Sequence, residues 1–280
     1  MKGSFAAFGA ALAGALPAQL YTTDAGVLSP ALPSLRERME WRRLRDTDEW
    51  LAETRLQWSP SRALQLDLAL PFVARRTDGA FSGRQEGLGD MLLGAKVALV
   101  RDDDVMRSDR LSVLFEVQAP TADEDASIDG IDLGPRAGLG LDVFGVAVGI
   151  AGTIVRDRHR AALALRWQEF GVDDGFAPGS VFAADLAWWY RLAPREFSRD
   201  DATELRLTTE LLTRVVADDR RVGDDPQNGG TEAILVVGLQ ANPSPTLRFE
   251  AGLRVPLVAT TVMPFGDERI GALFSCRLFF

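Results

Sequence analysis

Apolar and polar residues alternate along most of this chain, and the segment from Gly87 to Val100 shows the pattern well. Its apolar positions are Met91, Leu93, Ala95, Val97 and Leu99, and its polar or small ones are Asp90, Gly94, Lys96 and Ala98. Successive side chains of a β-strand point to opposite faces, so this period of two predicts a strand with one apolar face. Leu92 and Val100 are exceptions. At about 3.3 Å per residue, the segment could cross a bilayer on a tilt.

The same alternation recurs from Leu35 to Phe280 in segments of about ten residues, separated by clusters of turn residues. We count twelve, at 35–43, 49–58, 63–73, 87–100, 111–120, 144–154, 163–168, 182–192, 203–211, 233–240, 247–255 and 270–280. The first is the weakest. Counting Gly134–Asp142 as a further strand would make thirteen, whereas bacterial single-chain outer-membrane barrels have an even number.

The connections fall into two groups, one at each end of the predicted strands. The shorter group lies at 59–62, 101–110, 156–160, 194–202 and 242–245, and the mostly longer group at 75–86, 120–142, 172–179, 218–230 and 258–267. Short periplasmic turns and longer outer loops are typical of outer-membrane barrels. The connection 44–48 is an exception to this rule, because it is short although it lies at the same end as the longer group. The chain is therefore predicted to be an all-β, transmembrane, antiparallel up-and-down barrel of twelve strands in the outer membrane.

A soluble β-sandwich or barrel is the alternative, because its strands also alternate. Such strands are usually nearer five residues than ten. Trp50, Trp58, Trp167, Trp188 and Tyr190 fall on outward faces or near strand ends, as in the aromatic girdles of membrane barrels, whereas Trp189 points inward. The terminal Phe280 follows alternating apolar positions, which resembles the signal read by the outer-membrane assembly machinery.

The N-terminus predicts export. Met1 and Lys2 precede the apolar stretch Phe5–Leu16, which is the layout of a secretory signal, with cleavage after Ala15 or Ala18. A buried N-terminal helix is the alternative. We therefore expect a signal peptide at 1–18, a periplasmic segment at 19–34 and the barrel at 35–280.

Composition narrows the choice further. The net charge of −9 excludes nucleic-acid binding, which requires a basic surface. Cys276 is the only cysteine, so an intrachain disulfide is impossible. The chain has no internal apolar run of about 18 residues, which excludes a membrane-spanning helix.

Four short patches resemble one family. Tyr21–Gly26 is similar to a "TTDDAGT" pattern with one acidic residue missing, and Leu70–Val73 to an "lPyv" strand end. Gly87–Asp90, with Lys96 six residues on, resembles the most recognisable motif, and Val117–Thr121 resembles "slPTG", with Ala122 in place of the glycine. These patches are those of the outer-membrane, transporter-like family named for the meta-pathway of phenol degradation. The resemblance implies a barrel that passes small hydrophobic or aromatic compounds.

Charged side chains are costly on a lipid face, so those within strands are expected to face the lumen. The candidates are Asp67, Asp90, Lys96, Glu116, Arg166, Asp185, Arg206, Glu250, Arg254 and Arg277. Both signs occur, so many should pair across strands and fill part of the interior. Gly145, Ala147, Gly149 and Ala151 leave inward space on one wall, which favours a narrow passage.

No catalytic residue, metal or cofactor is predicted. Gly87-x-Gly-Asp90 lacks a third glycine and opens a strand, so it predicts a bend with Asp90 at the rim rather than a phosphate loop. The only histidine, His159, falls in a predicted periplasmic turn, which argues against a Ser–His site. The acidic runs 123–125, 218–219 and 224–225 could bind calcium weakly, but they lack EF-hand spacing and are interpreted as solvated charges.

The sequence thus predicts a non-enzymatic outer-membrane barrel that passes small, hydrophobic or aromatic molecules through a narrow lumen. Its predicted partners are membrane lipid, the assembly machinery and the solute. The alternative is a non-conducting structural or adhesive barrel whose acidic outer loops bind a partner.

Overall fold

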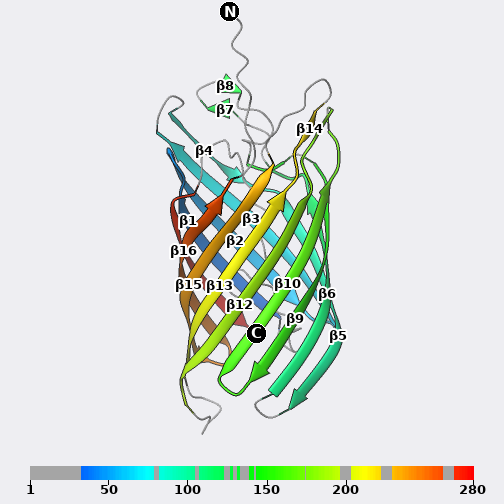
Figure 1. The fold of residues 1–280 in the computed structure, drawn as a ribbon, viewed down its shortest axis with the longest axis vertical. Helices are drawn as coiled ribbons and strands as arrows, with labels where there is room; N and C mark the ends of the chain where they lie inside the picture. The colour runs from blue at the N-terminus through cyan, green and yellow to red at the C-terminus, as the bar shows by residue number, and fades with distance from the viewer. Residues whose placement is uncertain are drawn as a thin grey trace, which may run out of the picture.

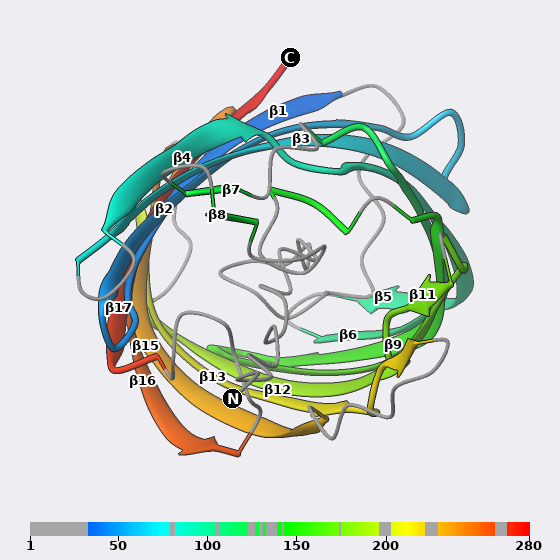
Figure 2. The ribbon, with the colours of Figure 1, turned by 90° about the horizontal axis from the view of Figure 1, so that it is seen from above.

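The fold is a closed β-barrel (Figures 1 and 2). The computed structural model describes residues 33–78, 82–104, 107–122, 127–128, 131–132, 139–141, 143–173, 175–195, 203–221, 229–260 and 268–280. In these ranges, no helix is long and apolar enough to cross a membrane. The predicted signal peptide and residues 19–32 of the predicted periplasmic segment lie outside the described residues, so both stay predictions.

Thirteen strands form one antiparallel sheet. They are β1 Ser34–Arg43, β2 Thr47–Trp58, β3 Leu64–Thr77, β4 Gly83–Leu88, β5 Met91–Asp104, β6 Arg107–Ala119, β9 Gly145–Arg156, β10 His159–Phe170, β12 Val181–Ala193, β13 Glu204–Val216, β15 Gly230–Ser244, β16 Leu247–Ala259 and β17 Ile270–Phe279. Two short ladders lie in the connections, β7 Ser127–Ile128 with β8 Ile131–Asp132, and β11 Phe176–Ala177 with β14 Arg220–Arg221. Because β4 and β5 both pair with β3, the circumference holds twelve strand positions, as predicted.

The barrel closes through β1, which pairs with β2 on one side and with β17 on the other. The β1–β17 ladder runs from Ser34 opposite Phe279 to Arg43 opposite Ile270. At its end the Phe280 N–H donates to the Pro33 carbonyl over 3.0 Å. Closure gives every strand of the sheet except β4 two neighbours, which satisfies the backbone polar groups that a bilayer could not hydrate.

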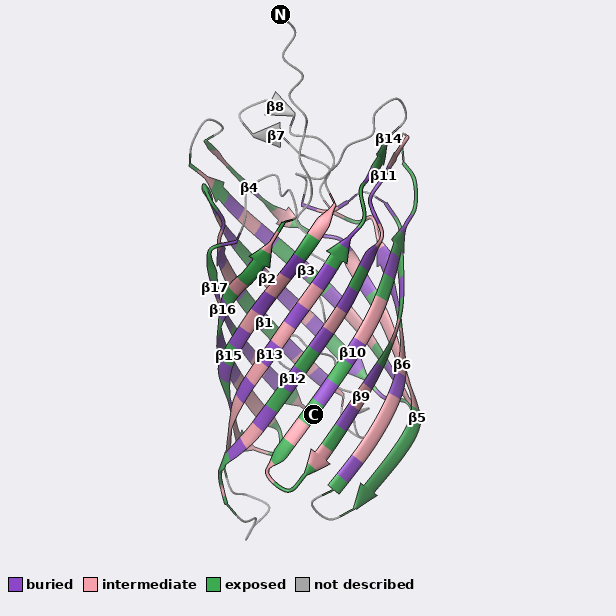
Figure 3. Cartoon of the chain, viewed as in Figure 1, coloured by how far each residue is buried: buried purple, intermediate pink, exposed green. Residues whose placement is uncertain are grey.

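The two faces of the wall differ as the alternation predicts (Figure 3). Outward apolar side chains are exposed, for example Met39 at 53% and Leu253 at 57%, whereas charged neighbours such as Arg38 and Arg254 are at most 2% exposed. In water so much exposed apolar surface would be a liability, and in lipid it is the stabilised arrangement. Trp189 lies inward at 1% exposure, and Trp50, Trp58 and Trp188 lie outward, as predicted.

The fourth strand position departs from the prediction, because Gly87–Val100 is not one strand. The ladder breaks at Gly89 and Asp90, between β4 and β5. On β3, Phe72–Thr77 pairs with β4, and Leu64–Ala69 pairs with β5. Pro71 lies at the junction and has no N–H to donate, and its carbonyl accepts the Gly89 N–H over 2.9 Å. The glycine-rich motif therefore marks a strand break.

The predicted connection 101–110 is also shorter than expected, because most of these residues lie in strands. β5 runs to Asp104 and β6 starts at Arg107, with a bulge between Ala98 and Val100 that accounts for the Val100 exception. The extended hairpin is held by charges, as Asp103 accepts hydrogen bonds from Arg101 and Arg110.

The two ends of the barrel differ in connection length, as predicted. Two-residue turns, 157–158 and 245–246, lie at the end that we call the inner end, where Asp157 adopts a φ of 52°. Aspartate tolerates this left-handed conformation, which tight hairpin turns favour. The outer end carries the connections that contain β7, β8, β11 and β14 (Figures 1 and 3). Short turns belong on the periplasmic side of such barrels.

The exposed apolar band predicts a depth-dependent cost of adding charge. We expect Leu253→Arg, in the middle of β16 on the lipid face, to lower the free energy of unfolding by about 2–4 kcal/mol. The matched control is Leu247→Arg, on the same face at the end of β16, with an expected cost of about 0–1 kcal/mol. Urea unfolding in lipid vesicles measures both. Equal costs would contradict a membrane-spanning β16.

Candidate functional site: the lining of the barrel

The inner face of the barrel divides into a charged wall and a small-residue wall. The charged wall comprises β16, β17, β1, β2 and β3, whose inward positions include the buried arginines and carboxylates of β1, β2 and β16 together with Asp67, Arg75 and Arg277. The small-residue wall comprises β9, β10 and β12, and its inward positions include Gly145, Ala147, Gly149, Ala151, Thr153, Ala162, Ala164, Ala183 and Ala187. Side chains thus project far from one wall and little from the other.

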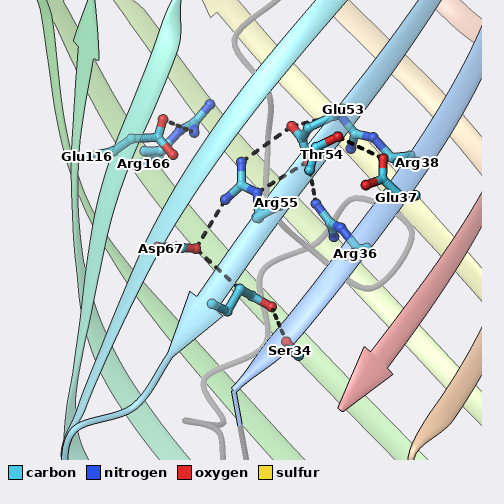
Figure 4. Close-up of polar contacts among 11 residues, drawn as sticks. Ser34, Arg36, Glu37, Arg38, Glu53, Thr54, Arg55, Asp67, Glu116 and Arg166 are labelled. Atoms are coloured by element: carbon cyan, nitrogen blue, oxygen red, sulfur yellow. Dashed lines mark hydrogen bonds and ion pairs between the residues drawn. The ribbon is translucent and has the colours of Figure 1, made fainter. Parts of the chain in front are cut away.

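Glu53 is the centre of the charged wall (Figure 4). Its carboxylate pairs with Arg36 at 2.6 Å, with Arg55 at 3.2 Å and with Arg38 at 3.4 Å. Arg55 also donates to Asp67 Oδ1 over 3.1 Å. Glu53 is fully buried and the three arginines are at most 2% exposed, so each charge depends on the others for compensation.

A second group of ion pairs lies nearer the outer end. Glu49 accepts hydrogen bonds from Arg42 and, over 2.5 Å, from Arg75 Nε. Arg254 holds Glu268 in a two-bond arrangement of 2.9 and 2.8 Å and lies 3.3 Å from Glu40. Bidentate arginine–carboxylate pairs are among the strongest polar contacts in proteins, so this side of the mouth is held in one arrangement.

One ion pair bridges the small-residue wall. Arg166 of β10 lies 3.3 Å from Glu116 of β6, and β9 runs between these two strands (Figure 4). The β9 residue directly opposite Arg166 is Gly149, which leaves the space that the arginine crosses. The predicted inward space at Gly149 is therefore partly occupied by this pair.

Asp90 joins the strand break to the long outer connection. Its carboxylate accepts hydrogen bonds from Gln118 Nε2 at 2.7 Å and the Leu141 N–H at 2.8 Å. It also accepts from the N–H groups of Thr121 and Ala122, both at 3.2 Å. A Cβ at Gly140 would lie 2.4 Å from Asp90 Oδ1, so a glycine is required there. One carboxylate thus holds both ends of the 120–141 connection.

The end of that connection packs inside the outer mouth. Leu139 contacts Leu51 and Val73, which are inward residues of β2 and β3. Leu141 belongs to a buried cluster with inward residues of β10, β12 and β13. The segment held by Asp90 therefore contacts the lining on both sides of the mouth.

The ten candidate residues lie on the inner side of the wall or at its rim, spread around the circumference. Asp67, Glu116, Arg166 and Arg254 are in the ion pairs described above, and Asp90 is at the rim. Arg206 pairs with Glu204 at 2.8 Å at the inner end. The structure does not bring the ten into one site, and which of them act in transport stays a prediction.

The remaining candidates line the lumen as follows. Lys96 lies opposite Gln65 of β3 and Leu114 of β6. Asp185 and Glu250 are 3% and 4% exposed, and in the described part of the chain Asp185 Oδ1 has no hydrogen-bond partner. Arg277 lies beside the Phe279 ring, with 5.9 Å from Cζ to the ring centroid. Phe280 ends the chain at 62% exposure, and its role in assembly stays a prediction.

Sequence reasoning missed the most densely paired residues. Glu53, Glu49 and Glu40 were not singled out, although each pairs with two or three buried arginines. The available signal was the pattern arginine, arginine, glutamate, arginine at every second position from Arg36 to Arg42. This strand has the weakest apolar face, which drew attention away from its polar one.

His159 is the first residue of β10, directly after the turn 157–158, and its side chain is exposed. Its ring lies 5.0 Å from that of Tyr190 and 5.8 Å from that of Trp188. Trp188 and Tyr190 stack at 5.9 Å on the outward face near the inner end, where an aromatic girdle is expected.

The acidic runs were considered for calcium. Asp218 and Asp219 accept the N–H groups of Gly229 and Gly179 over 2.6 and 2.8 Å. Residues 123–125 and 224–225 lie outside the described residues. Across the described ranges, no group of three His, Cys, Asp or Glu side chains is placed to hold a metal ion.

Comparison with known families assigns the chain. A family model described as "Putative MetA-pathway of phenol degradation" matches residues 45–257, which is more than half of the chain. The chain belongs to this family. The resemblance predicted from the four short patches is confirmed. No curated protein matches the chain in sequence.

One solved structure shares the fold of this MetA-pathway family member, and two others are more distantly similar. A COG4313 outer membrane channel from Pseudomonas putida F1 has a TM-score of 0.76 and 14% identity, over 92% of this chain and 99% of that chain. The NanC porin has a TM-score of 0.48 and 9% identity, over 87% and 98% of the two chains. LpxR from Salmonella typhimurium has a TM-score of 0.48 and 12% identity, over 88% and 100%. The predicted barrel and its outer-membrane location are confirmed.

Removing the central carboxylate of the charged wall should destabilise the barrel. We expect Glu53→Gln to lower the free energy of unfolding by about 3–5 kcal/mol, because three buried guanidiniums lose their shared counter-charge. The control is Glu86→Gln, whose partner Arg84 lies 2.5 Å away in a pair that is 71% and 50% exposed, with an expected loss of about 0–1 kcal/mol. Urea unfolding measures both losses. If Glu53→Gln lowered the free energy of unfolding no more than the control does, Glu53 would not be the shared counter-charge of the three arginines.

Removing the Asp90 carboxylate should release the outer connection. We expect Asp90→Ala to speed amide exchange of the peptide spanning 120–141 by about tenfold or more, since each lost charged hydrogen bond contributes about 1.5–3 kcal/mol. Asp102→Ala, at the exposed end of β5, is the control. Hydrogen–deuterium exchange read by mass spectrometry makes the comparison, and unchanged exchange in Asp90→Ala would rule out the anchoring role.

Proposed function

We propose that this MetA-pathway family member passes small hydrophobic or aromatic molecules along a narrow lumen and catalyses no reaction. The observation that carries the proposal is the division of the lining, with a recessed wall of glycine and alanine opposite a wall of fixed ion pairs. A twelve-stranded barrel falls between small barrels filled by side chains and open porins. The asymmetric lining favours a single path beside β9, β10 and β12.

The charged wall supports a path of constant shape. Some of its arginines are held by more than one carboxylate, as Arg55 is by Glu53 and Asp67, so these side chains are not free to collapse across the lumen. The small-residue wall has Ala151 and Ala162 within a layer of low side-chain volume. A solute would slide along this layer and face ordered polar groups on the other side.

Apolar lining supports the preference for hydrophobic solutes. Leu212, Ile234, Val236 and Leu273 form a buried cluster on inward positions of β13, β15 and β17. Binding sites for small molecules are mostly apolar with a few fixed polar groups, and this lining has that composition. The likeness to a COG4313 outer membrane channel supports conduction as the general role.

The placement of His159 supports a non-enzymatic barrel. The chain has one histidine, and it lies on the outward face with Trp188 and Tyr190, so it cannot serve as a base for a nucleophile in the lumen. Lipid contacts the outer band, and Phe280 is the proposed contact for the assembly machinery.

Reconstituted barrels should admit a small aromatic solute. We expect liposomes with the pure full chain to take up a phenyl glucoside, which crosses lipid slowly, faster than empty liposomes. In a Cys276→Ser background, Ala164→Cys should place a thiol on the small-residue wall. A charged thiol reagent should then slow uptake by about half or more, because it narrows the path.

The matched control is Leu163→Cys in the same background, since Leu163 is 48% exposed and faces lipid. Its uptake should not change on treatment. No uptake above that of empty liposomes would overturn the proposal and favour a non-conducting structural or adhesive barrel, in which the outer loops act as the binding surface.

A further inference from the structure

A row of arginines crosses four adjacent strands at one height near the inner end of the lumen. Arg248 of β16 lies directly opposite Arg277 of β17. Arg277 also lies opposite Arg36 of β1, and Arg36 lies opposite Arg55 of β2. All four occupy inward positions. Like charges directly opposite each other across strands are destabilising, so this row requires compensation.

The compensation is uneven along the row. Arg36 and Arg55 share Glu53, and Arg55 also reaches Asp67 (Figure 4). Arg277 is 8% exposed and makes no ion pair with a carboxylate in the described part of the chain, and its Nε has no hydrogen-bond partner there. Arg248 donates from Nε to the neutral Asn242 Oδ1 over 3.1 Å. Among the residues that the structure describes, two neighbouring guanidiniums are thus left without a paired carboxylate.

The row continues around the barrel through a chain of hydrogen bonds. Asn242, which accepts from Arg248, donates to Glu204 over 2.8 Å, and Glu204 pairs with Arg206 of β13 at 2.8 Å. Arg206 lies directly opposite Arg191 of β12.

Arg191, Arg206 and Arg160 line one cavity of about 480 Å³ at the inner end. We call the seven arginines the arginine belt, and its members are Arg36, Arg55, Arg160, Arg191, Arg206, Arg248 and Arg277.

The carboxylates near the belt are fewer than its cations. Those in ion pairs with it are Glu53, Asp67, Glu204 and Asp157, the last at 3.6 Å from Arg191. Glu250 lies one row further along the charged wall. The cavity is also lined by Asp103 and Asp104 and by Arg107, Arg110 and Arg158. With these and Glu250 included, the described residues supply seven carboxylates for ten arginines, and Glu53 is also shared with Arg38. The belt therefore has a positive excess in a chain whose net charge is −9.

Aromatic rings accompany the belt. The Phe279 ring centroid lies 5.6 Å from Arg248 Cζ and 5.9 Å from Arg277 Cζ. The Trp189 ring centroid lies 5.3 Å from Arg160 Cζ, and these two residues are directly opposite each other in the ladder of β10 and β12. Trp189 is 1% exposed, lines the cavity, and its Nε1–H has no acceptor among the described residues. Guanidiniums, an unused N–H donor and aromatic faces together suit a carboxylate attached to a ring.

Small side chains lie one step deeper in the lumen. Ala162 lies directly opposite Ala187, and the two pack in a buried cluster with Trp189. A ligand whose carboxylate met Arg160 and the Trp189 N–H would have space for an apolar ring against these alanines.

We infer that the arginine belt makes the lumen select anions and bind small arenecarboxylates, and this inference rests on the proposed channel function. Buried guanidiniums without paired carboxylates raise the free energy of the empty barrel, and an anion from solution lowers it. The positive excess also concentrates anions at the inner end of the path.

Ion selectivity tests the first half of the inference. In planar bilayers under a potassium chloride gradient, the reversal potential of the full chain should show that chloride permeates better than potassium. The double variant Arg248→Gln with Arg277→Gln should lower the chloride-to-potassium permeability ratio about twofold or more. The control with the same charge change is Arg76→Gln with Arg84→Gln, at exposed positions of the outer end, which should leave the ratio unchanged.

Ligand binding tests the second half without conduction. Detergent-solubilised full chain should bind radiolabelled benzoate, and the double variant should weaken binding about tenfold or more. Trp189→Phe keeps every charge and an aromatic ring but removes the N–H donor, so it should also weaken benzoate binding. This variant tests the inference if the double variant does not fold. Heat-modifiable migration on gels identifies folded barrels. Inorganic phosphate that displaces benzoate at equal concentration would overturn the preference for arenecarboxylates.

The outcomes separate this inference from the proposed function. The belt's role in selectivity would be refuted if the barrel conducted but preferred potassium. It would also be refuted if the double variant had the same permeability ratio as the control. Neither result would refute the channel function. If the barrel did not conduct but bound benzoate, and the variants lost that binding, the channel function would be refuted. The belt would then stand as a carboxylate-binding site.

Discussion

Ring closure between the first and last strands is the constraint on which the rest of this structure depends. A bilayer offers no water to an unpaired strand edge, so β1 must find β17 before the wall is stable in lipid. Closure fixes the register around the circumference, because each strand except β4 is aligned by two neighbours. That alignment places Arg36 between Arg55 and Arg277 and sets every inward charge beside particular others.

The charges inside the barrel follow from closure. A closed wall leaves charged side chains only the lumen, and the limited space there makes them compensate one another. The first two strands, β1 and β2, carry the pairs centred on Glu53 and Glu49. These pairs restrain side chains on one side, while glycine and alanine keep the opposite side shallow. The path of constant shape that we propose rests on this pairing of long residues and this segregation of short ones.

The motif that marks the family acquires a structural meaning. Gly89 and Asp90 interrupt the fourth strand position beside Pro71, and the Asp90 carboxylate collects four donors from the outer connection. A strand break turns backbone and side chain toward the mouth, where a continuous ladder would have held them in the wall. The motif therefore couples the wall to the segment that packs within the mouth.

Local alternation in the sequence determined the twelve strand positions, the inward and outward faces, the outward tryptophans and the inward Trp189, because a period of two depends only on neighbouring residues. It placed Asp67, Glu116, Arg166 and Arg254 on the polar face but could not name their partners. Arg166 meets Glu116 fifty positions away, across an intervening strand. Such pairs, the arginine belt and the four donors of Asp90 were decided only by the tertiary structure, since register and closure determine which distant side chains face one another.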